Sequence, residues 1–387
     1  MSPELARLSI RTKQGLTIYK AGLNNNGDGG YIQDFSRDSL EASETAHDYA
    51  MLRDQLIFGN LHQAKVQNPL NGAEPFKFHH QFPGVVFQRG LSTEYNASDA
   101  VALYLIGHAD YQQATGDRSL TEEFRDNLQG AVEVYTFSHI DSDTHQFVED
   151  PKFCGAEDFA LKRTDWKDSI VPKRDNGEPI YPVRLPNLQA QYMAGLRAAS
   201  TLFNTREFAR EAEKMRKGLQ ALFDYQRGTF HIAVDKLGPI PGVSSDPLNM
   251  MAYLDLEDLD PWQWEAIVKS SEVLETVAGY QNTDPEIAKD MPDDYHARVW
   301  PKEDANMHRG ASNKQLIARQ EGLHSLVDAF GHVMEVSFRT YGYLDSEPET
   351  LKVHDGMVEK AGMDPQLWTV TAKQYFRSVQ SLTPRAA

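Results

Sequence analysis

The sequence predicts an all-α protein built from helical hairpins, and two of its patterns indicate that fold class. Apolar residues recur at helical spacing along most of the 387 residues; Val101, Leu105 and His108, for example, are spaced i, i+4 and i+7 and share one helix face. Short turns alternate with long loops rich in Gly, Pro, Asp and aromatic residues. That alternation is typical of hairpins arranged in a ring, with functional side chains gathered on loops at one rim.

Several segments share the helical periodicity and are expected to be helices: about 38–65, 99–115, 119–135, 188–202, 208–222, 262–278, 315–330 and 367–376. Ser119 and Glu122 have the spacing of a capping box, which marks the start of the third helix. Weak strand patterns at 9–19 and 225–234 predict small hairpins on the rim of the ring.

The loops between the helices contain no sign of a domain boundary. The longest are 22–36, 66–94, 140–186, 238–248, 279–312 and 340–364. No shift in composition and no Ser/Gly-rich linker divides the chain, and no internal sequence repeat is readable. We therefore expect residues 1–387 to form a single domain, because ring and barrel folds reach this length as one unit.

Composition argues against two classes of partner. Asp and Glu outnumber Lys and Arg by 56 to 39, which gives a net charge of −17. Nucleic acids and anionic membranes attract basic surfaces, whereas neutral sugars are compatible with an acidic one. Cys154 is the single cysteine and excludes an internal disulfide. We expect a cytoplasmic protein, because no export signal opens the chain and no apolar run approaches about 20 residues.

Polar residues cluster at the starts of two expected helices. Tyr95, Asn96 and Asp99 lie at the start of the helix at 99–115, where their side chains could cap free backbone N–H groups. Arg37 and Asp38 open the first helix, and an adjacent guanidinium and carboxylate can grip neighbouring sugar hydroxyls. The alternative for this pair is a helix cap beside a surface charge.

A third cluster combines acidic and aromatic side chains in one loop, where Asp165 and Asp168 flank Trp166. Glycosidic cleavage generally needs two carboxyl groups around the bond. A nearby Trp offers a stacking face for a sugar and an apolar wall that raises a carboxyl pKa. The alternative is a loop ion pair with Arg163 or Lys167.

Two later loops hold further candidates. The loop at 294–304 concentrates aromatic, basic and acidic side chains and could line a pocket, although a Pro turn with scattered charges is the alternative. The loop at 343–350 is acidic, which by itself is more typical of solvated surface than of catalysis.

The sequence indicates neither a metal site nor a cofactor. Residues 24–29 resemble the start of a calcium-binding loop, but position twelve is Phe35 instead of a bidentate Glu. His79 and His80 lack metal-ligand spacing, and no phosphate-binding glycine loop is present. Cys154 has no neighbouring histidine in sequence that would make it a nucleophile. We therefore expect no cofactor and no metal.

Taken in chain order, these clusters resemble the six-hairpin glycosidases, most closely the amylo-α-1,6-glucosidase catalytic region of glycogen-debranching enzymes. The resemblance spans about 21–376 and rests on five motifs in the right order. They are an Ala-Gly…Arg-Asp segment at 21–38, Tyr-Asn-x-x-Asp-Ala at 95–100, a Thr-Trp-Met-Asp-like segment at 165–168, Val-Trp-Pro at 299–301, and Pro-Glu at 348–349 ahead of Gln-x-Trp at 366–368.

The resemblance implies an (α/α)6 barrel and an exo-acting, inverting glycoside hydrolase of the α-glucosidase type, with a small carbohydrate as its partner. By position in the motifs, Asp168 would be the general acid, and Glu349, with Glu347 as second choice, would be the base that activates water. The implied sugar-binding residues are Arg37, Asp38, Tyr95, Asp99, Trp166, Trp300, Glu303, Gln366 and Trp368.

Departures from the family pattern leave the substrate open. Phe35 and Ser36 stand where the family has Trp-Gly before Arg37, and a family Glu is replaced by Asn187. The large donor and partner domains of debranching enzymes are not part of this sequence, so a small α-glucoside or oligosaccharide is expected rather than a glycogen branch. The alternatives are a sucrose-cleaving invertase of the helical-barrel type, a sugar 2-epimerase with paired histidines, and a non-catalytic sugar-binding module.

Overall fold

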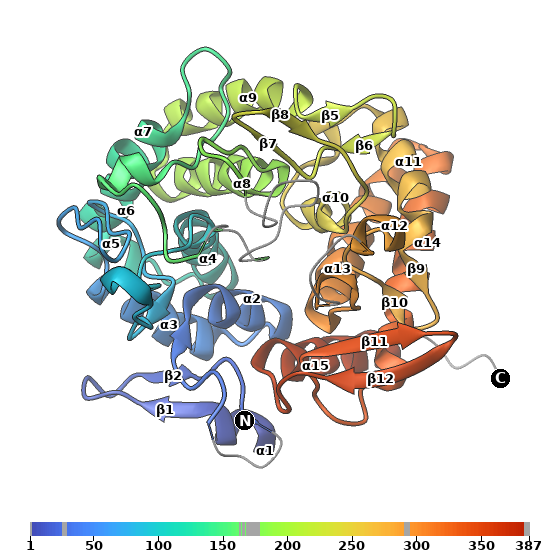
Figure 1. Cartoon of the computed structure of the whole chain (residues 1–387), viewed down its shortest axis with the longest axis horizontal. Helices are drawn as coiled ribbons and strands as arrows, with labels where there is room; N and C mark the ends of the chain where they lie inside the picture. The colour runs from blue at the N-terminus through green and yellow to red at the C-terminus, as the bar shows by residue number, and fades with distance from the viewer. Residues whose placement is uncertain are drawn as a thin grey trace.

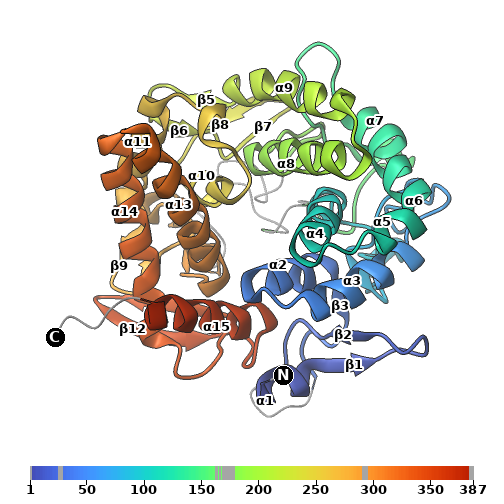
Figure 2. The same cartoon turned by 180° about the vertical axis from the view of Figure 1, so that it is seen from behind.

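The computed structural model describes residues 2–24, 29–161, 164, 167, 179–289 and 295–382. These residues form a ring of helices in two layers, seen from its two ends in Figures 1 and 2. The inner layer consists of α2 (Ser36–Ala46), α4 (Asp99–Thr115), α8 (Pro186–Phe203), α10 (Asp246–Asn249), α13 (Pro301–Glu321) and α15 (Leu367–Leu382). The expected all-α class and (α/α)6 barrel with small β-hairpins are confirmed.

The outer layer packs against the inner helices. It contains α3 (Tyr49–Leu61), α5 (Ser119–Glu123), α6 (Arg125–Gly130), α7 (Phe137–His139), α9 (Arg206–Gln220), α11 (Pro261–Ser270) and α14 (His324–Phe338), with α1 (Pro3–Leu8) beside α15. The sequence of α9 explains its place, because Phe208, Ala212 and Met215 make one buried stripe on an otherwise polar helix. The inner α4 is instead buried on all sides from Asp99 to Leu105.

Pairs of short antiparallel strands decorate the ring. They are β1–β2 (Ser9–Arg11, Thr17–Tyr19), β3–β4 (Asp34–Phe35, Gln81–Phe82), β5–β6 (Phe223–Asp224, Thr229–Phe230), β7–β8 (Ala233–Asp235, Gly238–Ile240), β9–β10 (Glu275–Thr276, Gly279–Tyr280) and β11–β12 (Thr350–His354, Met357–Ala361). The hairpin expected at 9–19 is confirmed as β1–β2. The segment at 225–234 contains β6 and the start of β7, but these strands belong to two different hairpins, β5–β6 and β7–β8.

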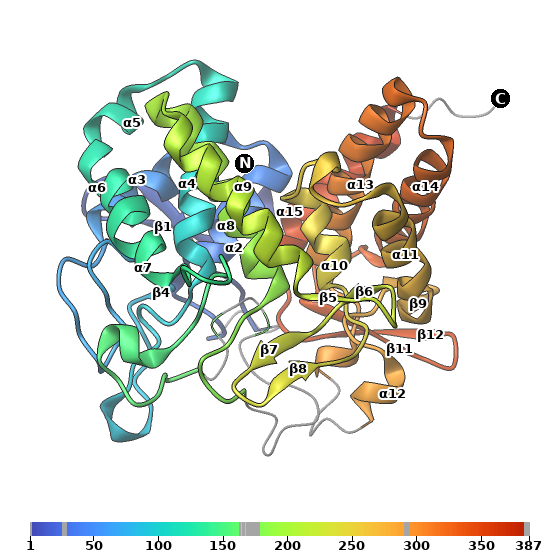
Figure 3. The same ribbon diagram turned by 90° about the horizontal axis from the view of Figure 1, so that it is seen from above.

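One end of the ring gathers loops and strands. Figure 3 shows β7, β8, β11, β12 and α12 (Pro285–Ala288) together at this end. Single bridges pair Arg184 with Val234 just before α8 begins, and Val299 with Leu351 just before α13 begins. The first turns of inner helices therefore face the loop-rich end, as the alternation of short turns and long loops predicts.

The long helix expected at 38–65 is wrong, because the structure has two helices there. His47 adopts a left-handed conformation (φ 51°), which ends α2. Asp48 then caps α3, since its carboxylate accepts a hydrogen bond from the Met51 N–H at 3.0 Å. The apolar pattern continues across this turn, which hides it from a periodicity argument.

The helix expected at 315–330 is wrong for the same reason. Gly322 (φ 73°) ends α13, and α14 begins two residues later at His324. The helix expected at 262–278 ends at Ser270 and is followed by a 3₁₀ turn and β9. The helices expected at 99–115, 188–202, 208–222 and 367–376 are confirmed as α4, α8, α9 and α15.

The predicted side-chain caps are not the bonds that form. At the start of α4 the Asn96 side chain instead accepts from the Ala160 N–H (3.1 Å) and donates to the Leu161 carbonyl (3.1 Å). Before α5 it is Asp117 that accepts the Ser119 N–H, at 2.8 Å. The helical stretch predicted to 135 runs through α5, α6 and a π-helical turn over Ala131–Thr136.

Two kinds of feature are absent from the described part of the chain. No helix there is long and apolar enough to cross a membrane. Within the same residues, no group of three or more His, Cys, Asp or Glu side chains is placed to hold a metal ion.

Candidate active site

A buried ion pair joins two inner helices at the loop-rich end. Arg37 lies on the first turn of α2 and Asp99 on the first turn of α4, with Nε and Oδ2 2.5 Å apart and Nη2 and Oδ1 3.2 Å apart. Two parallel bonds of this kind fix both side chains in one plane. The neighbouring predicted residue Asp38 is also buried, at 4% exposure. The sequence motifs at 37–38 and at 99, far apart in the chain, therefore meet at one point.

Two tryptophans form an aromatic wall. Trp300 immediately precedes α13 and Trp368 lies on the first turn of α15; their ring centroids are 5.6 Å apart at an interplanar angle of 66°. Tyr295 packs edge-on against Trp300 at 4.8 Å. The Lys302 ammonium lies 4.9 Å from the Trp368 ring centroid. Aromatic faces beside a cation suit the apolar face and hydroxyls of a sugar ring.

The two candidate bases occupy different environments. Glu349 is 3% exposed, and it accepts hydrogen bonds from the Tyr295 hydroxyl (2.8 Å) and the Met363 backbone N–H (3.1 Å). Burial raises the pKa of Glu349, while these two bonds and the Arg298 charge oppose that rise. Glu347 instead forms an ion pair with Lys373 on α15. Tyr295 thus links Glu349 to the aromatic wall, and this geometry favours Glu349.

A second charged network follows the first turn of α13. Lys302 pairs with Glu41 of α2 at 2.6 Å and lies 3.8 Å from Glu303. The Glu303 carboxyl group accepts a hydrogen bond from the Asn249 side chain. Burial raises the pKa of Glu303 to about 8, with Lys302 opposing the rise and Glu41 adding to it. At neutral pH Glu303 is therefore mostly protonated and can donate a hydrogen bond.

Asp168, the predicted acid, and Trp166, a predicted stacking residue, lie outside the described residues. Two of their neighbours are described and anchored to the barrel. Thr164 is hydrogen-bonded through its hydroxyl to the Ser98 hydroxyl at 2.9 Å, and Lys167 pairs with Asp246 of α10 at 2.7 Å. Ser98 directly precedes α4, so both anchor points belong to the start of an inner helix.

Two predicted binding residues are occupied by other contacts. The Tyr95 hydroxyl donates to the His62 carbonyl at 2.7 Å, and the ring packs with Ala64 and Ala73. Gln366 is buried against Gly22, so closely that a Cβ on that glycine would lie 2.0 Å from Gln366 Oε1. The Tyr95 hydroxyl is therefore bound at the end of α3 and not to the cluster of Arg37, Trp300, Lys302 and Trp368.

Several residues of this cluster are not singled out by the sequence. Glu41, Asp246 and Asn249 carry no motif, and only the fold brings them beside Lys302 and Glu303. His80 is a further case. Burial and the Arg37 charge lower its pKa well below the usual value, so its ring is neutral. A polar residue among the apolar positions of a segment is the one sequence signal that could have indicated them.

No protein-family model matches the sequence, and no curated protein matches it. Solved structures do. The GH63 mannosylglycerate hydrolase from Thermus thermophilus, in complex with Tris and D-glycerate, has a TM-score of 0.67 at 12% identity over 96% of this chain and 98% of that chain. The same enzyme in complex with glucose has a TM-score of 0.65 at 13% identity over 97% of each chain. A rhamnosidase from Klebsiella oxytoca with rhamnose bound has a TM-score of 0.51 at 12% identity over 94% of this chain and 60% of that chain.

At such low identity these similarities establish the fold. The chain has the six-hairpin architecture shared by these glycosidases, as the sequence motifs predicted. The narrower resemblance to amylo-α-1,6-glucosidases stays a prediction.

Proposed function

We propose that this protein is an exo-acting, inverting glycoside hydrolase that releases a terminal glucose from a small α-glucoside. The observation that carries the proposal is the placement of Glu349: a buried carboxylate, held by Tyr295, beside the Trp300–Trp368 wall. The same architecture in solved glycosidases supports it. The aglycone is open, and a glycerate-like acid is one candidate because the first of these neighbours is a mannosylglycerate hydrolase.

In the proposed mechanism two carboxyl groups act from opposite faces of the sugar. Asp168 donates its proton to the leaving-group oxygen, and Glu349 takes a proton from the water that attacks the anomeric carbon. Inversion requires the two carboxyl groups to be roughly 6.5–9.5 Å apart, which leaves room for that water. Glu347 is the weaker choice for the base because Lys373 already pairs with it.

The remaining side chains hold the sugar. Arg37 and Asp99 present a fixed fork of donors and acceptors to vicinal hydroxyls, with Asp38 beside them. Trp300, Trp368 and the predicted Trp166 offer stacking faces. Glu303, protonated at neutral pH, adds a hydrogen-bond donor next to Lys302.

A substrate panel tests the proposal. The protein is incubated with maltose, isomaltose, trehalose, sucrose, glucosylglycerol, glucosylglycerate and mannosylglycerate, and proton NMR follows the anomer of the released sugar. We expect β-glucose to appear first from one α-glucoside. Initial release of α-glucose from a substrate whose leaving group is not glucose, such as glucosylglycerol or sucrose, would refute inversion. Cleavage of sucrose alone would favour the invertase alternative.

The epimerase alternative is tested by the same NMR measurement. That reaction needs a pair of histidines as acid and base, whereas of the two adjacent histidines near Arg37, His79 is committed to Asp34 at 2.9 Å. Free glucose and mannose are added separately, and interconversion of the two sugars would replace hydrolysis as the proposed activity.

Asp168→Asn tests the proposed acid. An amide cannot protonate the leaving group, so we expect hydrolysis to fall by at least about 10²-fold. Circular dichroism checks that the fold is retained. Substantial residual hydrolysis by the variant would overturn the role of Asp168. If the wild-type protein hydrolyses no substrate, and the variant binds sugar as the wild type does, a binding module would be favoured.

A further inference from the structure

A polar pocket lies at the opposite end of the barrel from the candidate active site. Its lining comes from α2, α3, α4 and α13, and its volume is about 490 Å³. Glu44 and Arg309 each lie seven residues beyond Arg37 and Lys302 on their helices, a separation of roughly 10 Å along the axis. Asp110 lies further still from Asp99. The pocket is therefore separate from the cluster around Glu349 and Trp368.

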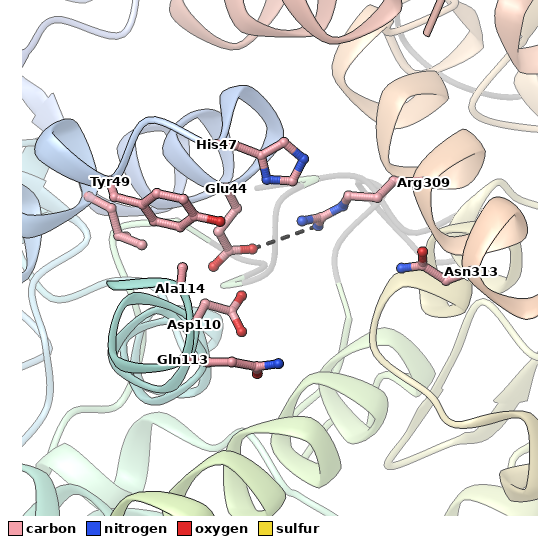
Figure 4. A pocket seen from close by; sticks show the side chains of 9 residues that line it. Glu44, His47, Tyr49, Asp110, Gln113, Ala114, Arg309 and Asn313 are labelled. Atoms are coloured by element: carbon pink, nitrogen blue, oxygen red, sulfur yellow. Dashed lines mark ion pairs between the residues drawn. The ribbon is translucent and has the colours of Figure 1, made fainter. Parts of the chain in front are cut away.

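The centre of this pocket holds a buried carboxyl group that is only partly satisfied. Glu44 is 5% exposed, and its Oε1 has no hydrogen-bond partner among the described residues. Its other oxygen, Oε2, lies 3.6 Å from Arg309 Nη2. Figure 4 shows the carboxyl groups of Glu44 and Asp110 and the Arg309 guanidinium directed into the same space. A buried oxygen without a partner is costly, and a ligand hydroxyl would remove that cost.

Besides the His47 imidazole and the apolar Leu52 and Ala114, the rest of the lining supplies carboxamides and an aromatic ring. Gln113 and Asn313 contribute carboxamides, and Tyr49 contributes a phenol ring at one side (Figure 4). Carboxylates, carboxamides and guanidinium groups can each engage two neighbouring hydroxyls at once. The volume falls within the range of about 300–1,000 Å³ that is usual for small-molecule sites.

We propose that this pocket is a second binding site, which takes a neutral polyol of monosaccharide size. Glu44 and Asp110 would accept hydrogen bonds from its hydroxyls, and Arg309 and the two carboxamides would donate to them.

The charges of the lining favour a neutral ligand over an ion. The Arg309 guanidinium, which an anion would need, is already within reach of the Glu44 carboxyl, which a cation would need. Burial and the Asp110 charge raise the pKa of Glu44, so that carboxyl can also act as a donor. Hydroxyl groups, which both donate and accept, match such a mixed lining.

Equilibrium dialysis of the full chain against labelled glucose tests the proposal. Gln113 is exposed at the pocket, so Gln113→Trp would fill the space without burying a polar group. Gln320→Trp is the matched control, since Gln320 is an exposed residue near the end of α13.

Trp368→Ala removes a residue of the candidate active site. We expect Gln113→Trp to weaken glucose binding at one of two sites by about tenfold or more, with hydrolysis and the other site unchanged.

The variants separate this proposal from the proposed function. Trp368→Ala should remove one equivalent of bound glucose, Gln113→Trp the other, and the double variant both. If Trp368→Ala alone removes all bound glucose, or if Gln113→Trp changes nothing in that background, the second site does not exist. Ala114→Trp, at the same pocket, replaces Gln113→Trp if the latter is unfolded by circular dichroism.

The class of ligand is tested by competition. Glycerol, methylammonium and inorganic phosphate are each added to the dialysis with the Trp368→Ala variant. Glycerol should compete with glucose, and neither ion should. Displacement of glucose by methylammonium would reassign the pocket to a cation, and displacement by phosphate to an anion.

Discussion

At the level of single residues, two chemically identical carboxyl groups have different environments. Glu347 and Glu349 lie two residues apart in one acidic loop, yet Glu347 is held by Lys373 whereas Glu349 is buried against Tyr295. The Lys373 ammonium thus occupies Glu347, whereas the two hydrogen bonds that Glu349 accepts fix its orientation beside the Trp300–Trp368 wall.

The matched pair Glu349→Gln and Glu347→Gln tests this distinction. We expect Glu349→Gln to lower kcat by about 10²–10⁴-fold, because the base is lost. Glu347→Gln should lower it by less than about tenfold, since it removes a partly exposed ion pair. Kinetics on the substrate found in the panel give both values, and the reverse order would make Glu347 the base.

Tyr295→Phe tests how Glu349 is tuned. The Tyr295 hydroxyl stabilises the ionised carboxylate and so lowers its pKa. Its loss should raise the pKa of Glu349, and the acidic limb of the kcat/KM profile should move to higher pH. Tyr343→Phe, in the apolar cluster beside β11, is the control and should leave the profile unchanged. A shift toward lower pH would contradict this role.

Among the secondary-structure elements, the β11–β12 hairpin and the segment after it position the proposed base. Glu349 directly precedes β11, and Gly362 directly follows β12. Gly362 has φ 82°, and a Cβ on it would lie 2.2 Å from Glu349 Oε2. Glycine is therefore required there for two reasons, backbone conformation and close approach.

Gly362→Ala and Gly356→Ala separate those two reasons. Both residues have positive φ, but a Cβ at Gly356 meets open space. We expect each variant to lose about 1–2 kcal/mol of unfolding free energy from backbone strain. Gly362→Ala should lose about 1–3 kcal/mol more from overpacking, and should also lose activity. Urea denaturation measures the stability, and equal effects of the two variants would argue against a tight contact at Glu349.

Across the barrel as a whole, several charged and titratable groups are buried. Arg37, Glu41 and Glu44 are all buried on α2 and meet partners on α4 or α13 across the barrel. His108 and His308 are buried with them, in the neutral state. Burial lowers the pKa of His108 to about 3 and that of His308 to about 4. The stability of this protein is therefore linked to pH through its interior.

His108→Gln isolates one such group. Between about pH 6.5 and about pH 3 the unfolded chain binds a proton at His108 that the folded chain does not, so this residue destabilises the fold as the pH falls. In that range the free energy of unfolding should fall with falling pH less steeply for the variant than for the wild type. The two slopes should differ by about 1.4 kcal/mol per pH unit. Urea denaturation at several pH values measures both slopes. Equal slopes would mean that His108 is protonated in the folded state.

Much of the fold was predictable because its signals are local. Periodicity identified α4, α8, α9 and α15, and the alternation of turns and loops identified the ring. The two wrong helices, at 38–65 and 315–330, fail at single left-handed residues, His47 and Gly322. One residue can reverse the chain without interrupting the apolar pattern on either side.

The candidate site was predictable only where it coincides with motifs. Arg37, Asp99, Trp300, Glu303, Glu349 and Trp368 belong to such motifs, and each contacts another residue of the cluster described above. Glu41, Asp246 and Asn249 do not, because nothing local distinguishes a buried polar side chain from an exposed one. Tyr95 shows the converse, since its motif is present while its hydroxyl is bound to His62.

Local sequence patterns were sufficient for the class of fold, the order of the polar clusters along the chain and the acidic, sugar-compatible character of the protein. Those properties depend on composition and on residues within a few turns of one another. The folded chain was needed to learn which carboxylate lies against the aromatic wall, which charges pair across the barrel, and that a second polar pocket lies at the far end. These features depend on contacts between segments far apart in the chain, such as Arg37 with Asp99, and on burial, which converts an ordinary carboxyl or imidazole into one with a shifted pKa.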